Sequence, residues 1–295
     1  MARAADMPES GESPSAQSTS AQSTWAKSAW AQSTWARGGR LVLSAIAGVV
    51  TPLVSIVILF AIWEGLLRYF DVPVWLVPKP SDFLGRIVAE WPTLLHHAWV
   101  TSLTIAAGFL IGIVIAVPLA LALVAIPALE RGLYPVIVFL NIMPKTVIGP
   151  ILIVWFGVSI MVSVLIVFLM SFFPVLVDAM SGFRSLDPRL RYITRSMGAS
   201  RWQTFRHVRL PAAMPSIYAG MSIGVVKAVE GVIIAEFIAS NAGLGYLIMR
   251  ASSFMDMPLM FSGLIVTALV ALLFTAATTL AGRLLMPWAF RKGTA

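Results

Sequence analysis

Long apolar runs separated by short charged segments dominate the chain. The run from Leu41 to Trp63 holds 23 residues without a charge, and about 20 apolar residues allow a helix to cross the hydrocarbon core of a bilayer. A second long run lies between Glu90 and Glu130, where no other charged residue occurs. The pattern predicts six membrane-spanning helices. They are expected at about residues 41–67, 99–126, 133–157, 160–182, 213–239 and 259–287.

The third predicted span differs from the others because Pro144, Lys145, Gly149 and Pro150 interrupt its apolar run. A proline inside a helix removes one backbone hydrogen bond, and its ring clashes with the preceding turn. Irregular backbone at membrane depth is tolerated only where protein or water satisfies the freed polar groups. We therefore expect a broken helix here.

The first 40 residues are different in kind. The tetrapeptide AQST occurs at 16–19, 21–24 and 31–34, and Trp25, Trp30 and Trp35 recur every five residues, which is neither a helical nor a strand period. Such a polar, repetitive segment has too little apolar mass to fold by itself. We expect a disordered cytoplasmic tail over 1–40 and a membrane domain over 41–295. The tail is not expected to be a signal peptide, because no apolar core precedes Leu41.

Composition agrees with a membrane protein. Of the 295 residues 59% are hydrophobic and only 12% are charged, with a mean hydropathy of +0.88, whereas soluble domains carry about 25% charged residues. A water-soluble fold of this size lacks the charge to cover its surface. The expected fold class is therefore an all-α polytopic membrane protein.

Candidate catalytic and metal-binding groups are absent from the sequence pattern. There is no cysteine, and His96, His97 and His207 form no cluster with carboxylates at ligand spacing. No Ser/His/Asp or paired-carboxylate arrangement indicates hydrolysis. We expect no enzyme activity, no metal and no cofactor in this chain. The net charge of +8 does not indicate a nucleic-acid partner, because cytoplasmic loops of membrane proteins carry an excess of Lys and Arg.

The distribution of Lys and Arg predicts the orientation. With the N-terminus inside the cell, the inside segments hold fifteen of these residues and the outside segments hold four, while Lys145 and Lys227 lie within spans. This asymmetry follows the positive-inside rule. We expect six spans with both termini cytoplasmic.

The segment 184–211, called the arginine loop below, holds seven of the inside arginines between the fourth and fifth spans. Asp187 followed by Pro188 is typical of a helix start. Leu190, Ile193 and Met197 then recur at helical spacing and form one apolar stripe.

A second short helix is expected in the same loop. Gly198 is suited to end the first helix in the left-handed conformation. Ser200 and Gln203 form a capping-box pattern that starts the second. Leu210 before Pro211 is expected to stop it, since a residue before proline avoids helical geometry. The loop is thus predicted to be two amphipathic helices joined at a glycine hinge. The amphipathic pattern suits an anionic lipid surface as well as a protein partner.

A family resemblance favours the protein partner. Gly198 and, nine residues later, Val208-Arg209-Leu210-Pro211 resemble the motif in the coupling loop of permease subunits of ABC importers, in the branch that takes up nitrate, sulfonates and taurine. The resemblance extends over about residues 55–290, through "WEGLLR" (63–68), "PKPSDF" (78–83), "MPKTVIGPILIVWFG" (143–157) and "AEFIASNAGLGYLI" (235–248). It implies an ATPase-coupling interface. Its expected residues are Gly198, Ala199, Ser200, Arg201, Trp202, Phe205, Arg206, Leu210 and Pro211.

The resemblance also implies partners and a location. These are a cytoplasmic ABC ATPase subunit that binds ATP and Mg²⁺, an external solute-binding protein, a second copy of the chain, and the bacterial inner membrane. The cargo is expected to be a small organic or inorganic anion. No G-x-x-x-x-G-K-[ST] phosphate loop occurs in the chain, so the ATPase must be another polypeptide. One departure is that Tyr192-Ile193-Thr194 replaces the family's Glu-Ala-Ala.

Ionisable residues at membrane depth are candidates for the translocation pathway or its gate. Lys227 and Glu230, three residues apart, are such candidates, or they simply neutralise each other. Glu236 either lines an external gate or holds the 240–250 segment in place. The "GLG" at 243–245 is expected to be a tight turn at the external face.

Lys145 is the fourth candidate. It either faces the pathway and favours an anionic solute, or it pairs with Asp178 or Glu64. A stand-alone secondary transporter or channel is the alternative function. Such folds often contain internal repeats, and no convincing repeat relates the two halves of this chain.

Overall fold

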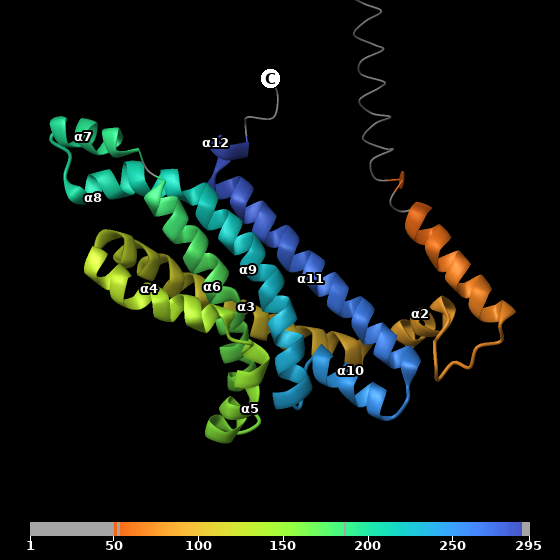
Figure 1. The fold of residues 1–295 in the computed structure, drawn as a ribbon. Helices are drawn as coiled ribbons and strands as arrows, with labels where there is room; N and C mark the ends of the chain where they lie inside the picture. Colours follow the sequence, from red (N-terminus) through yellow and green to blue (C-terminus); the bar gives the residue numbers. More distant parts are fainter. Residues whose placement is uncertain (1–49, 52–53, 186, 291–295) are drawn as a thin grey trace, which may run out of the picture. The chain divides into compact units, whose positions relative to one another are not determined.

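The computed structural model describes residues 50–51, 54–185 and 187–290, and every regular element within these ranges is helical (Figure 1). The predicted 1–40 tail and the start of the first span lie outside the described residues. The chain divides into two compact units, Met1–Leu66 and Leu67–Ala295. Residues 54–66 of the first unit are helical, within the predicted first span. The all-α class is confirmed for the described residues.

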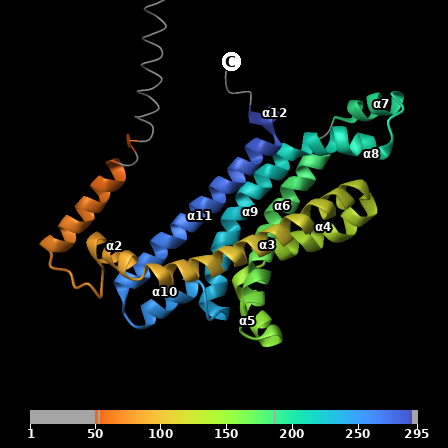
Figure 2. The same cartoon turned by 180° about the vertical axis from the view of Figure 1, so that it is seen from behind.

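The second unit is an assembly of long helices joined by short turns (Figures 1 and 2). Helix α6 makes the most extensive contacts, with α9 and with α3. The helices are α2 (Pro80–Ala89), α3 (Trp91–Ala125), α4 (Pro127–Ile142), α5 (Lys145–Phe156), α6 (Ile160–Arg184), α7 (Pro188–Ser196), α8 (Arg201–Thr204), the π-helix η1 (Phe205–Arg209), α9 (Leu210–Ala239), α10 (Leu244–Ser253), α11 (Met257–Leu285) and α12 (Pro287–Phe290).

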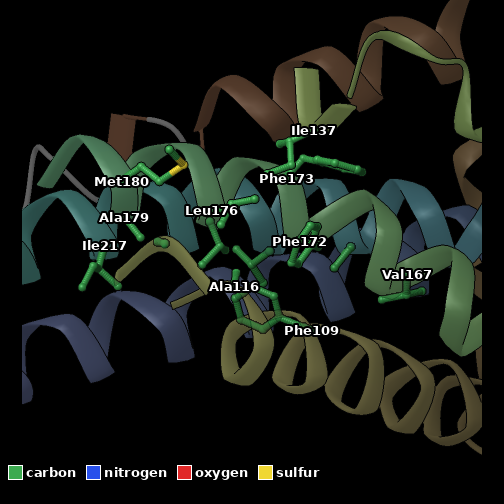
Figure 3. Close-up of a cluster of buried hydrophobic side chains, with 14 of the residues drawn as sticks. Phe109, Ala116, Ile137, Val167, Phe172, Phe173, Leu176, Ala179, Met180 and Ile217 are labelled. Carbon is green, nitrogen blue, oxygen red and sulfur yellow. The ribbon is translucent and has the colours of Figure 1, made fainter. Parts of the chain in front are cut away.

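Small residues allow α3, α6 and α9 to approach closely. A Cβ placed on Gly108 of α3 meets the Val167 side chain of α6 at 2.6 Å, and one placed on Gly224 of α9 meets Val175 of α6 at 3.0 Å. Lipid tails are as apolar as leucine, so helices in a membrane associate through such close packing rather than by excluding water. Figure 3 shows the resulting apolar core, in which Phe109, Phe172 and Leu176 meet between the three helices.

The second unit contains several helices that could cross a membrane, as expected for a polytopic protein. Within the described residues α3, α6 and α11 are each long and apolar enough to cross a bilayer, and α4 with α5 passes the same criterion as one bent pair. The predicted fifth span falls on α9, whose 30 residues extend about 45 Å at 1.5 Å per residue. Three charged residues in its second half lower its hydropathy.

The broken third span is confirmed, although the break has a single position. Helices α4 and α5 meet at 95° across Met143 and Pro144. Pro150 lies inside α5 without ending it, so the prediction that several residues interrupt the span was wrong in that detail. Pro144 begins a new helix as its N-cap, where the lack of an N–H has no consequence.

Two helices were misjudged from sequence. Helix α3 begins at Trp91, eight residues before the predicted second span, because Pro92 lies in its first turn, where proline is compatible with a helix. A tight turn was expected at 243–245, and no helix was expected to follow it. The turn is present at Gly243, but the ten-residue helix α10 follows it directly.

Candidate functional site

The arginine loop begins with a capped helix. The backbone N–H of Arg189 donates to the Asp187 carboxylate at 2.8 Å, and that of Leu190 donates to the Asp187 carbonyl at 3.1 Å. Pro188 occupies the first helical position. Both features match the sequence prediction, because a side-chain cap satisfies N–H groups that have no partner within the helix.

Gly198 ends this helix in the predicted left-handed conformation, with φ of +71°. The N–H of Ala199 donates to the carbonyl of Thr194 at 3.0 Å, which is the six-to-one bond of a Schellman motif. L-residues rarely adopt this φ, so glycine is favoured at this position. The reversal between α7 and α8 is therefore specified by hydrogen bonds and by one residue's backbone.

The second helix starts as predicted but does not stop where predicted. Ser200 accepts from the N–H of Gln203 at 3.2 Å, and the Gln203 side chain accepts from the N–H of Ser200 at 2.8 Å. Instead of ending at Leu210-Pro211, the helix continues through η1 into α9. The Leu210 N–H bonds to the carbonyl of Phe205, five residues back.

The wider π-turn explains why Pro211 is tolerated. In an α-helix its ring would clash with the carbonyl four residues earlier, whereas a π-turn inserts one extra residue and moves that carbonyl away. The consequence is one uninterrupted helix over residues 201–239, called the continuous helix below. The chain is therefore helical from α8 to the far end of α9, with the π-turn and Pro211 between the two helices.

The arginine loop presents apolar side chains that its own fold leaves uncovered. Tyr192 is 74% exposed, Met197 79% and Trp202 65%. The Trp202 ring packs 5.5 Å from the Phe205 ring, and Phe205 in turn packs against the core of α3, α6 and α9. In both views α7 and α8 project from the end of α6 and α9 (Figures 1 and 2). Large exposed apolar side chains on such a projection are typical of a surface that contacts a protein or a membrane.

A cavity separates the arginine loop from the α3–α4 turn. Its volume is about 610 Å³. It is lined by Val124, Ala125, Pro127, Thr194, Ala199, Arg201, Thr204 and Arg209. At the same end of the unit, Arg184 at the end of α6 forms an ion pair with Glu130 of α4, and its guanidinium lies 5.6 Å from the Tyr134 ring. These contacts fix α4 against the base of the loop.

Glu236 lies at the opposite end of α9 and is 2% exposed. Its carboxylate accepts from the Thr101 hydroxyl at 2.9 and 3.0 Å and from the N–H of Gly245 at 2.8 Å. The same hydroxyl accepts from the N–H of Leu244 at 2.8 Å, and His97 Nδ1 accepts from the N–H of Gly243 at 3.0 Å. These side chains, called the Glu236 clamp below, satisfy three successive N–H groups at the start of α10.

The glycines of the clamp are there because the carboxylate is so close. A Cβ on Gly243, which has φ of +111°, would lie 2.3 Å from the Glu236 carboxylate, and one on Gly245 would lie 2.7 Å from the Glu236 Cβ. Of the two roles considered for Glu236, this geometry supports holding the 240–250 segment. Sequence reasoning missed Thr101 and His97; the available signal was two polar residues at i and i+4 in an apolar run, which share one helix face.

The remaining candidates, Lys145, Lys227 and Glu230, lie outside the arginine loop and the Glu236 clamp. Lys227 pairs with Glu230 at 2.7 Å. Lys145 donates to the backbone carbonyl of Asn141 and, at 3.2 Å, to its side-chain oxygen. Among the described residues no ion pair joins Lys145 to Asp178. The described residues also contain no group of three His, Cys, Asp or Glu side chains able to hold a metal ion.

Comparison with known families agrees with this architecture. Residues 108–291, which include the arginine loop and Glu236 but not Thr101 or His97, match the family described as binding-protein-dependent transport system inner membrane component. The chain belongs to this family. Its members are permease components of transport systems, so the chain is a transport protein of the membrane rather than an enzyme.

The sequences of individual relatives align with most of this permease. It is 30% identical over 238 residues to the formylaminopyrimidine transport permease protein ThiX of Halalkalibacterium halodurans, covering 80% of this chain and 95% of the relative. It is 31% identical over 237 residues to the riboflavin transport system permease protein RibX of Chloroflexus aurantiacus (80% and 88%). It is 26% identical over 241 residues to the taurine transport system permease protein TauC of Escherichia coli (79% and 88%).

A solved structure shares the fold. A chain of the MetNI methionine ABC transporter, in an inward-facing conformation, superposes with a TM-score of 0.58 at 18% identity, covering 66% of this permease and 97% of that chain. The likeness establishes a common helical architecture for the matched part.

Proposed function

We propose that the chain is a membrane subunit of an ABC importer in which the arginine loop docks on a separate ATPase subunit that binds ATP and Mg²⁺. One observation carries this proposal: an exposed aromatic surface on a capped hairpin is continuous, through η1, with a 30-residue helix. A surface that only anchored the protein to lipid would not need to be continuous with a helix of the core. The family membership supports the same assignment.

The proposed orientation places the arginine loop and both termini in the cytoplasm. The seven arginines of 184–211 support it through the positive-inside rule. The Glu236 clamp and α10 then lie at the external side, where a solute-binding protein would deliver cargo. Two copies of the chain would enclose the pathway, since symmetric pairs are the commonest assemblies of identical chains.

The proposed mechanism follows from the continuous helix. ATP binding would draw two ATPase subunits together, and the docked α8 segments would move with them. Because residues 201–239 form one helix, this movement would tilt α9 and the α6 packed along it. Interfaces between packed helices switch between discrete arrangements rather than deforming gradually, so the tilt would convert an outward-facing pathway to an inward-facing one.

Co-expression with the cognate ABC ATPase tests this function. Charge reversal at Arg201 and Arg206 is expected to abolish co-purification of the ATPase, because both side chains flank Trp202 on the docking surface. Arg131→Glu is the matched control. It reverses another exposed arginine, near the start of α4, outside the loop. Loss of the partner in the control as well as in the double variant would contradict a specific docking surface.

A stand-alone transporter is the competing function, and one experiment separates the two. Proteoliposomes that contain this chain alone, with an imposed proton or sodium gradient, are expected to accumulate no taurine, riboflavin or nitrate. Gradient-driven accumulation of any of them would overturn the proposed function.

A further inference from the structure

Two lysines and one glutamate lie on the α5–α9 side of the helix core, where apolar residues are otherwise expected. Lys145 begins α5, and Lys227 and Glu230 are on α9. Asn141 at the end of α4 is the hydrogen-bond partner of Lys145. None of these residues belongs to the arginine loop or to the Glu236 clamp.

The contacts of α6 show that the two lysines lie at one level. The Lys145 ammonium is 5.2 Å from the centre of the Phe173 ring. Met170 of α6 faces Gly231 of α9, and Val175 faces Gly224, so Phe173 lies level with the segment that contains Lys227.

This level is deep within the membrane-spanning region. Phe173 lies eleven residues before Arg184, the end of α6 at the arginine loop, which corresponds to about 16 Å along the helix axis. That distance is about half of a hydrocarbon core of roughly 30 Å. The lysines are therefore near the middle of the bilayer, and not near a headgroup layer.

The group is polar, partly exposed and positive overall. Lys227 and Glu230 are 44% and 47% exposed and neutralise each other. Lys145 is left with a net positive charge, because its hydrogen-bond partner Asn141 is neutral. The ammonium has three donors, and the described residues supply it only with the backbone and side-chain oxygens of Asn141.

A lipid-facing position for this group is energetically unfavourable. A lysine at the centre of a helix in the bilayer costs about 2.5–3.5 kcal/mol even on the most lenient scale, and such residues face a water-filled cavity or a protein partner. A half-exposed ion pair beside a second cation fits a hydrated surface. An anionic group from the pathway would supply the missing charge and accept the third Lys145 donor.

We propose that Lys145, with the Lys227–Glu230 pair beside it, lines the translocation pathway and binds the anionic group of the transported solute. The inference deepens the proposed importer function and rests on it. The chemical class of cargo is a small solute with a sulfonate, carboxylate or similar anionic head. In a symmetric pair of chains, two such sites would give the pathway a net charge of +2.

Thiol labelling tests the site even while the cargo is unidentified. The chain has no cysteine, so a single introduced thiol reports one position. Ile223→Cys lies one helical turn before Lys227 and is 50% exposed as isoleucine. The probes are sulfonatoethyl and trimethylammonioethyl methanethiosulfonate, applied to the permease–ATPase complex in nanodiscs. Each labelling rate is divided by the rate of the same reagent with 2-mercaptoethanol.

A matched position on α11 controls for lipid exposure. Gly282 of α11 contacts Tyr218 of α9, and the helices run in opposite directions, so Leu273 lies at the depth of Lys227. Leu273→Cys is 67% exposed as leucine and is expected to resist both charged reagents. Ile223→Cys is expected to react with both, and about tenfold faster with the anionic one.

The proposal is tested by asking whether the preference for the anionic reagent depends on Lys145. In the Ile223→Cys background, Lys145→Gln is expected to remove most of the preference for the anionic reagent, and Lys145→Arg is expected to keep it. Two results would overturn the proposal: labelling at Ile223→Cys as slow as at Leu273→Cys, or an anion preference that Lys145→Gln leaves unchanged. Co-purification of the ATPase is measured for the unlabelled wild-type chain and for every variant. If the wild-type chain does not bind the ATPase, the proposed importer function fails, and this result is distinct from the labelling results.

Discussion

Replacement of Thr101 by valine is expected to release the start of α10. The Thr101 hydroxyl donates to the Glu236 carboxylate and accepts from the N–H of Leu244 at 2.8 Å. Valine has nearly the same shape but makes neither bond. Each buried group left without its partner costs about 1–3 kcal/mol, so the two lost bonds predict about 2–6 kcal/mol of local destabilisation.

Thr104→Val is the matched control. Thr104 is also buried on α3, but its hydroxyl donates only to the carbonyl of Val100 in its own helix, at 3.0 Å. That carbonyl keeps its place in the helix when the hydroxyl is lost. The same substitution is therefore expected to cost less than about 1 kcal/mol at this position.

Hydrogen–deuterium exchange of the purified protein in nanodiscs measures the difference. The amides of Leu244 and Gly245 bond directly to the Glu236 clamp. Their protection is expected to fall by a factor of at least about 30 in Thr101→Val, since each 1.4 kcal/mol corresponds to a factor of ten. If the amides of residues 243–247 were equally protected from exchange in Thr101→Val and Thr104→Val, the Thr101 hydroxyl would not hold the start of α10.

Three further outcomes are expected. Ser200→Ala removes a cap and destabilises α8 by about 1 kcal/mol, which faster amide exchange at Gln203 would report. Gly108→Leu forces a side chain against Val167 of α6; it is expected to lower the melting temperature, and the second change Val167→Ala to restore part of the loss. Gly243→Ala places a methyl group 2.3 Å from the Glu236 carboxylate and is expected to disorder the start of α10 at least as much as Thr101→Val, as measured by the same exchange experiment.

Sequence reasoning succeeded where the signal is local. The cap at Asp187, the hinge at Gly198 and the capping box of Ser200 each depend on residues within six positions of one another. Local hydrogen-bonding rules therefore predicted the α7–α8 hairpin of the arginine loop. A break in the third span was predictable from its prolines, but its position at Pro144 was not, because Pro150 lies inside α5 without ending it.

Sequence reasoning failed where distant residues or competing local signals decide the structure. Thr101 and Glu236 are separated by 135 residues, and nothing near either of them indicates that they meet. Leu210-Pro211 carries a stop signal that a π-turn overrides, and no short pattern distinguishes a helix that ends from one that widens by one residue. The position of Lys145 beside Phe173 likewise depends on how α5 packs on α6.

The proposed mechanism requires α8 and α9 to move together when ATP binds. Spin labels at Met197→Cys, 79% exposed in the arginine loop, and at Ile238→Cys, 42% exposed at the far end of α9, allow distances between two copies to be measured by pulsed electron paramagnetic resonance in the permease–ATPase complex. ATP is expected to change the distance between the two copies of each spin label, at Met197 and at Ile238. A change at Met197 with none at Ile238 would contradict it, because the loop would then move without the helix.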